Sequence, residues 1–382
     1  MDHPIYLDYA AATPIDPRVA LAMQPYTELL FYNPSATYLK AVAVRHALEQ
    51  ARSSVALQMG CRPSEIIFTA GGTEANNLAI YGIMRLHPNA NIVVSAIEHE
   101  AVLAPAAEYN PRVVQPTQGG FIEPSAVEAV INDDTVLVSI MYANNEVGTV
   151  QPIHKLSQLV RKIRRDRKDR GVLMPLYLHT DACQAANYLD LKVSRLGVDL
   201  MTLNGGKVYG PRQSGVLYVR GGLQLRPLII GGGQERGLRS GTENVAHAIG
   251  IAYALEIAQT IRHDESKRTQ SLQRQFIELL SKHVPQAVIN GSLKHRLPNN
   301  IHITIPGIDN ERLLMQLDEV GIMAAAGSAC SAGNDEPSHV LRALGIPDQL
   351  ARSSIRFTMG HSTTSDEVLR VVTELARLVN GA

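Results

Sequence analysis

Residues 200–211 read LMTLNGGKVYGP, a short apolar run that ends in a glycine-rich turn carrying one lysine. Apolar runs of the same kind, rich in β-branched residues, recur along the chain with helical stretches between them. They lie at residues 66–69, 92–97, 136–141, 176–179, 200–203 and 215–219. Short buried strands that alternate with helices are typical of a mostly parallel α/β sheet, so we expect this fold class.

Polar or glycine-rich segments follow most of these runs. They are GGTE at 71–74, EHE at 98–100, NNE at 144–146, DACQ at 181–184 and NGGK at 204–207. Ligands of open α/β sheets bind at the carboxyl ends of the strands. We therefore expect these segments to converge on one crevice.

The expected elements become shorter from about residue 290. Strands are predicted at 301–305 and 354–359, and helices at 310–320 and 365–379. This change predicts a large cofactor-binding domain at residues 15–260 and a small α+β domain at 261–382, completed by residues 1–14. A helix near residues 244–262 is the expected connector.

The composition is that of a globular protein, with 45% hydrophobic and 19% charged residues among 382. A formal net charge of +0 argues against a protein that neutralises phosphates over a large surface. The basic run at 161–170 follows an apolar helical stripe, so we interpret it as a solvated face and expect no direct nucleic-acid binding. No apolar run approaches the about 20 residues of a membrane span, and the first residues lack a signal-peptide pattern. We expect a cytoplasmic protein without a membrane partner.

The three cysteines, Cys61, Cys183 and Cys330, have neither metal-ligand nor redox-pair spacing. We expect no metal site and no disulfide framework. Cys61 has no functional context, and we interpret Cys183 as small core filling. Cys330 lies in a run of mostly small residues, 324–334, which predicts a loop.

Three segments are candidates for binding and catalysis, each with an alternative. Gly72 and Thr73 open a helix at 75–86 whose free N–H groups suit a phosphate, or they form a plain turn capped by Thr73. Lys207, if buried, would supply the neutral amine of Schiff-base chemistry, or it is a surface lysine. Asp181 would pair with a protonated pyridine nitrogen, or it caps a helix.

Taken in order, the motifs resemble those of the NifS/IscS-type cysteine desulfurases. These enzymes are class V aminotransferases that use pyridoxal 5'-phosphate, so the resemblance implies the type I fold of pyridoxal-phosphate transferases. The motifs run from about residue 5 to residue 375. They are YLDYAAATP at 6–14, NPS at 33–35, GTEANN at 72–77, EH at 98–99, NNEVG at 144–148, Asp181 with Gln184, KVYGP at 207–211, RSGT at 239–242 and GSAC at 327–330.

The resemblance implies a role for each matching residue. Lys207 would form the Schiff base, Asp181 would pair with the pyridine nitrogen, and Gln184 would donate to the phenolate of the cofactor. His99 would stack on the ring and transfer a proton. Cys330 would be the catalytic cysteine that accepts sulfur.

The remaining implied roles concern the phosphate and the substrate. Gly72, Thr73 and Asn204 would hold the phosphate, and Thr242 would reach the phosphate site of the partner subunit, because family members are homodimers with shared active sites. Asn145, at the cofactor, and Arg356 would bind the substrate carboxylate; the planar fork of arginine suits a carboxylate.

The resemblance therefore implies conversion of L-cysteine to L-alanine, with the sulfur left on Cys330 as a persulfide. Delivery would be to a sulfur-acceptor protein, unidentified here, in iron–sulfur cluster assembly or tRNA thiolation. The alternatives are a selenocysteine lyase, another class V lyase or transaminase, and a degenerate homologue that acts only through interactions.

Two departures from the family pattern bear on these expectations. The family usually has Ser-Gly-His-Lys where this chain has Asn204-Gly205-Gly206-Lys207, so we expect weaker phosphate anchoring unless Asn204, a backbone N–H or water compensates. The chain also ends about 20 residues after the segment 360–364, so we do not expect the tail-mediated docking of scaffold-binding members.

Overall fold

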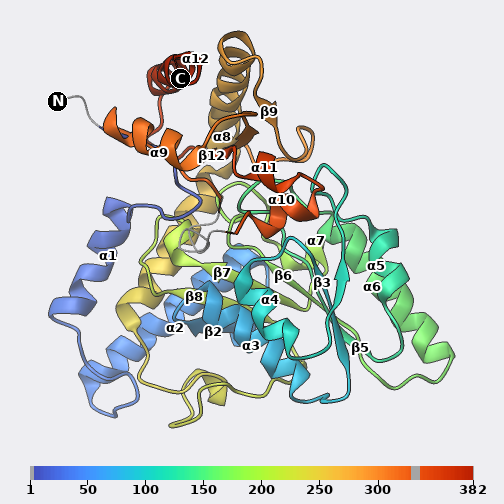
Figure 1. Ribbon diagram of the computed structural model, residues 1–382. Coiled ribbons are helices and arrows are strands. Elements are labelled where there is room, and N and C mark those ends of the chain that lie inside the picture. Colours follow the sequence, from blue (N-terminus) through green and yellow to red (C-terminus); the bar gives the residue numbers. More distant parts are fainter. Residues whose placement is uncertain (1–3, 328–335, 382) are drawn as a thin grey trace.

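A computed structural model describes residues 4–327 and 336–381, and its centre is a seven-stranded sheet in the order β2-β8-β7-β6-β5-β3-β4 (Figure 1). The strands are β2 (Ile66–Thr69), β3 (Asn91–Ser95), β4 (Arg112–Val114), β5 (Thr135–Ser139), β6 (Tyr177–Asp181), β7 (Leu200–Asn204) and β8 (Gly215–Val219). All neighbours pair in parallel except β8, which is antiparallel to both β2 and β7. The predicted α/β class with a mostly parallel sheet is confirmed. The edge strand β4 was not predicted.

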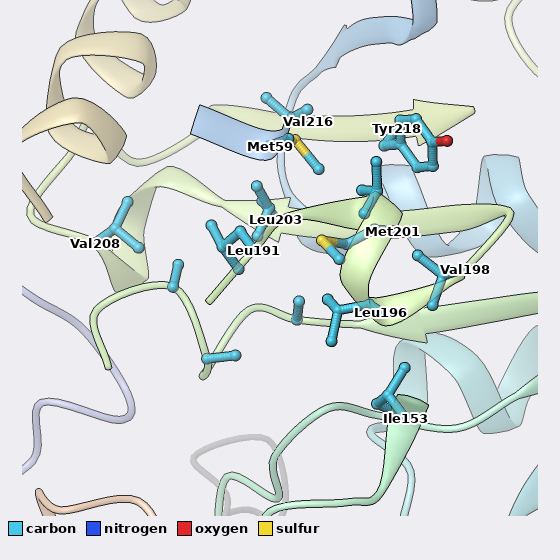
Figure 2. Close-up of a cluster of buried hydrophobic side chains, with 14 of the residues drawn as sticks. Met59, Ile153, Leu191, Leu196, Val198, Met201, Leu203, Val208, Val216 and Tyr218 are labelled. Atoms are coloured by element: carbon cyan, nitrogen blue, oxygen red, sulfur yellow. The ribbon is translucent and has the colours of Figure 1, made fainter. Parts of the chain in front are cut away.

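Alternate residues of each strand point to opposite faces of the sheet, and both faces are buried. Met201 and Leu203 of β7 belong to the apolar core that α2 (Leu39–Met59), α6 (Ile153–Asp169) and α8 (Val245–His283) cover. Figure 2 shows these side chains close to those of β8. Leu200 faces the opposite core, under α3 (Gly72–Met84) and α4 (Glu100–Ala107). The sheet is therefore fixed between two helical layers.

A second core lies beside the large sheet and joins both ends of the chain. It contains Ile5, Phe276, Phe357 and Leu375, all at most 2% exposed. The antiparallel sheet β12-β10-β9 and the parallel pair β1-β11 contribute to it. The elements of this part are β1 (Ile5–Tyr6), β9 (Val288–Ile289), β10 (Asn300–Thr304), α9 (Asn310–Glu319), β11 (Ile322–Met323), α10 (His339–Ala343), α11 (Asp348–Ala351), β12 (Ser354–Thr358) and α12 (Ser365–Asn380).

The connecting helix is longer than expected. We predicted it near residues 244–262, whereas α8 continues without a break to His283 and contacts both cores. The predicted boundary between residues 260 and 261 falls inside this helix. The division into two domains stays a prediction. Three further helices precede α8 in the chain: α1 (Pro17–Glu28), α5 (Pro124–Val130) and α7 (Val193–Leu196).

The basic helix α6 differs in one respect from its interpretation as a solvated face. Arg167 is only 2% exposed, and its guanidinium donates to the carbonyl oxygen of Thr135 at 2.9 Å. This arginine ties the end of α6 to the start of β5. No helix in the described part of the chain has the length and apolar character that crossing a membrane requires.

A buried ion pair fixes the segment that carries Thr242. Arg52 of α2 donates both terminal nitrogens to Glu235 at 2.8 Å, and the two residues are 3% and 6% exposed. Glu235 also accepts from the backbone N–H of Phe68 at 2.9 Å. Glu235 has a φ of 48°, a left-handed conformation that few residues adopt without such anchoring.

Replacing Glu235 by glutamine should destabilise the fold by about 3–5 kcal/mol, because the buried guanidinium of Arg52 loses its counter-charge. Urea denaturation measures this change. The matched control is Glu49→Gln, which removes the 55% exposed carboxylate on the other side of Arg52 and should cost less than about 1 kcal/mol. Equal losses in the two variants would contradict the assignment of Glu235 as the essential partner.

Candidate active site

A pocket lies at the carboxyl ends of the strands of the large sheet. The segments that follow β2, β3, β5, β6 and β7 all contribute to its wall, as the sequence pattern predicted. The residues with implied roles that line it are Gly72, Thr73, His99, Asn145, Asp181, Gln184, Asn204, Lys207 and Arg356.

Lys207 follows β7 on a short 3-10 turn, Gly205–Lys207. Its Nζ donates to the carbonyl oxygens of Ala10 and Ala11 at 2.8 and 2.6 Å, and the residue is half-buried. Only glycine fits at position 205, because a Cβ there would lie 2.0 Å from Ser214 Oγ. Asn204 caps the turn, since its Oδ1 accepts from the Gly206 N–H at 3.0 Å. The lysine amine is therefore held at the pocket by the N-terminal segment.

Asp181, at the end of β6, presents a buried carboxylate to the pocket and is 8% exposed. Its Oδ2 accepts from Asn76 Nδ2 at 2.7 Å, and its Oδ1 accepts from the Cys183 N–H at 2.9 Å. It forms no ion pair with the residues that the structure describes. A buried carboxylate of this kind suits a cationic group of a ligand.

His99 lies at the end of α4 that faces the pocket, where its ring caps the helix. Nδ1 accepts from the backbone N–H of Ala101 at 3.0 Å. In the neutral ring the proton is therefore on Nε2. The cap fixes the ring and leaves it half-buried in the pocket wall.

Arg356 reaches the pocket from β12 and is 1% exposed. Its guanidinium donates to Asp8 Oδ1 at 2.6 Å and to the carbonyl oxygen of Asn145 at 2.9 Å. Its Nε is buried without a hydrogen-bond partner among the described residues. The role of Asp8 was missed in the sequence, although the residue belongs to the first quoted motif.

The remaining candidates lie in different surroundings. Gln184 Nε2 donates to the carbonyl oxygen of Ala10 at 3.0 Å. Gly72 opens α3 at a close approach, where a Cβ would lie 2.8 Å from Cys183 Sγ. Thr242 is not on the wall of the Lys207 pocket; it lines a separate hollow with Phe68 and His247.

The two described cysteines are poor nucleophiles. Burial raises the pKa of the Cys61 thiol to about 12. Burial and the Asp181 carboxylate raise the pKa of the Cys183 thiol well above its usual range. Cys330 lies outside the described residues.

Two buried groups near the pocket, His179 and Glu98, had no role assigned to them from the sequence. His179 is 0% exposed, and its ring nitrogens contact Ser139 Oγ at 2.8 Å and Thr202 Oγ1 at 3.1 Å; burial lowers its pKa to about 4. Glu98 is also 0% exposed, and burial raises its pKa to about 8. Its Oε1 accepts from Ser95 Oγ at 2.5 Å and from the Met141 N–H at 2.8 Å.

The sequence is similar to known enzymes along nearly its whole length. The Aminotransferase class-V family matches residues 5–371. The cysteine desulfurase IscS of Dictyoglomus turgidum is 39% identical over 99% of this chain and 95% of its own. That of Methanosarcina thermophila is 39% identical over 98% of this chain and 92% of its own.

Solved structures are similar as well. A NifS-like protein superposes with a TM-score of 0.90 at 30% identity, over 99% of this chain and all (100%) of its own. A NifS-like protein from Rickettsia africae gives 0.88 at 28% identity, over 100% of both chains. SspA in complex with cysteine gives 0.79 at 34% identity, over 93% of this chain and 98% of its own.

The buried carboxyl of Glu98 makes a prediction about stability and pH. Its pKa in the folded protein, about 8, is above the ordinary 4.5, so the folded state keeps a proton that the unfolded state releases between these values. The free energy of unfolding should therefore fall through this window, by about 1.4 kcal/mol per pH unit. The variant Glu98→Gln lacks this pH-dependent term. The free energy of unfolding of the variant minus that of the wild type should therefore rise over the same pH window and then level off.

Chemical denaturation of both proteins at several pH values from about 5 to about 9 measures the difference. Taking the difference cancels the groups that the two proteins share. Parallel pH profiles would contradict a protonated Glu98 in the folded state.

Proposed function

This chain belongs to the class V aminotransferase family, and we infer that it is a pyridoxal-phosphate-dependent cysteine desulfurase that converts L-cysteine to L-alanine. One observation supports the roles proposed below for individual residues. The amine of Lys207, the carboxylate of Asp181 and the guanidinium of Arg356 line a single pocket. The relatives and solved structures described above support the activity.

The pocket residues fit pyridoxal phosphate. Asp181 is a buried carboxylate that can pair with the pyridinium nitrogen, and Asn76 fixes its orientation. Gly72 lets the start of α3 approach closely, where the free N–H groups and Thr73 suit a phosphate. Lys207 presents an amine that can bind the aldehyde carbon. When bound, the cofactor supplies an electron sink that makes the α-proton of an amino acid removable.

The chain's own groups then have distinct tasks. Arg356 and the side chain of Asn145 would bind the carboxylate of L-cysteine, which fixes the α-carbon in the pocket. Lys207 Nζ would accept the α-proton. His99, with its proton on Nε2 when neutral, would stack against the ring and donate a proton. Gln184 would donate to the phenolate oxygen of the cofactor.

Sulfur transfer would require a thiolate on Cys330. In this step the bond between Cβ and sulfur of the substrate breaks, and a bond forms between that sulfur and Cys330 Sγ. The Cβ atom gains the electron pair and a proton to become the methyl group of alanine, and the transferred sulfur is oxidised to the persulfide level. No external oxidant or reductant is needed.

Further proposals concern the assembly and the cell. We propose a homodimer in which Thr242 reaches the phosphate site of the partner subunit. Exposed apolar residues support an interface between copies, among them Phe31 at 72%, Leu39 at 87% and Ile230 at 83% exposed. We also propose the division at residues 260 and 261, with residues 1–14 completing the small domain, because Ile5 and Leu7 belong to the same core as Phe276.

The cytoplasm is the expected compartment, since free thiols such as Cys61 persist in reducing surroundings. The persulfide would pass to an acceptor protein of iron–sulfur cluster assembly or tRNA thiolation.

The activity is tested by incubating the protein with L-cysteine and pyridoxal phosphate and measuring alanine, sulfide and protein persulfide. Lys207→Ala should lose all detectable turnover. Cys330→Ser should keep the change in visible absorption on cysteine addition but form no persulfide, because the two steps use different groups. Full activity in Lys207→Ala, or a persulfide located on Cys61 or Cys183, would contradict the assigned roles.

A mixing experiment tests the shared site. Thr242→Ala should weaken cofactor retention, and mixing it with Lys207→Ala should restore part of the activity. A hybrid dimer then has one site with an intact Lys207 from one subunit and an intact Thr242 from the other. Absence of any recovery after verified subunit exchange would mean that each site is built within one chain.

A further inference from the structure

A second hollow adjoins the Lys207 pocket and shares Gly72, Thr73, Asn204 and Lys207 with it. It lies at the N-terminus of α3, a helix of 13 residues, whose first N–H groups and positive dipole end favour an anion. Arg212 is part of its wall. The phosphate end of the proposed cofactor would therefore face this hollow.

The turn between β7 and Lys207 offers little charge to such an anion. Gly206 has no side chain. Its φ is not positive, so its backbone conformation would also allow a residue with a side chain. A Cβ at Gly206 would meet Asn204 Oδ1 at 3.5 Å and Arg212 Cγ at 3.6 Å, which are ordinary contacts. The aliphatic stem of Arg212 thus lies directly beside the position where a side chain at 206 would begin.

The backbone that carries Arg212 is fixed. The Gly205 N–H donates to the Ser214 carbonyl oxygen at 2.9 Å, and Ser214 Oγ donates to the Pro211 carbonyl oxygen at 2.6 Å. Gln213 has a φ of 56°, a left-handed conformation within this closed turn. The turn therefore holds the Cα of Arg212 within 3.8 Å of the Cβ position of Gly206.

The guanidinium of Arg212 is available to a ligand. The residue is exposed and forms no hydrogen bond or ion pair with the residues that the structure describes. The carboxylate in the same hollow, Glu74, pairs with Arg239 at 2.9 Å. An anion in the hollow would thus meet the guanidinium of Arg212, which forms no ion pair with the described residues.

We propose that Arg212 binds the phosphate of pyridoxal phosphate and supplies the charge that the side chain missing at Gly206 does not. The planar fork of arginine matches two phosphate oxygens. This inference rests on the proposed function, and it makes Arg212 a binding residue for the cofactor within its own chain. It accounts for how a turn that reads Asn204-Gly205-Gly206-Lys207 can anchor a phosphate.

The test compares two ligands that differ only in the phosphate. Dissociation constants of pyridoxal phosphate and of pyridoxal are measured by absorption titration of full-length protein stripped of cofactor. Arg212→Ala should weaken the affinity for pyridoxal phosphate about 10-fold. This is the lower end of the range for losing a hydrogen bond to a charged group, and we expect it because the arginine is exposed. The affinity for pyridoxal should stay the same. Arg165→Ala, an exposed arginine of α6 outside both hollows, is the control for lost charge and should change neither constant.

A rescue experiment completes the design. Gly206→His in the Arg212→Ala background should restore most of the lost affinity for pyridoxal phosphate, because it returns a donor to the same place. Equal affinity for pyridoxal phosphate in wild type and Arg212→Ala would overturn the inference, and so would an equal loss for both ligands, which would mean a structural effect. If neither ligand binds the wild type, the proposed function fails and this inference fails with it.

Discussion

The common direction of β2, β3, β5, β6 and β7 is the constraint on which the site depends. Only β8 opposes it among the strands of the large sheet. Each of the five strands therefore ends at the same edge, and the first polar residues after it meet those of its neighbours. Thr73, His99 and Asp181 each come from a different strand end, yet no long loop is needed to bring them together. The site residues are held in place because they follow directly on the buried strands of the sheet.

Much of the fold and most of the pocket could be predicted, because their signals are local. A run of β-branched residues predicts a strand, and the polar residues after it predict the pocket wall. The edge strand β4 escaped notice because it has only three residues, two of them exposed. Asp8 and Arg356 could not be paired from the sequence, since 348 positions separate them and no periodicity links them. Arg167 resembled its solvated neighbours, and only the folded chain reveals its carbonyl partners.

Three charged groups at the pocket are each held by a neighbouring polar group. Asn76 holds Asp181, Asp8 holds Arg356, and the carbonyls of Ala10 and Ala11 hold Lys207. Such partners reduce the rotamers that each group must lose when a ligand binds. The ion pair with Asp8 therefore fixes the direction in which the guanidinium of Arg356 faces the pocket.

The strand β1 links the N-terminal segment to the C-terminal part of the chain. It pairs with β11, and Ala10 N–H donates to Thr358 Oγ1 at 2.9 Å, while the carbonyl of the same alanine holds Lys207. Ala10 and Thr358 lie 348 positions apart, so this contact forms only when distant parts of the chain meet. Contacts of such sequence separation close late in folding. The strands of the large sheet lie between residues 66 and 219, but the lysine pocket is complete only when β1 has paired with β11 and Ala10 has reached Thr358, so a cofactor can be held there only after these distant segments have met.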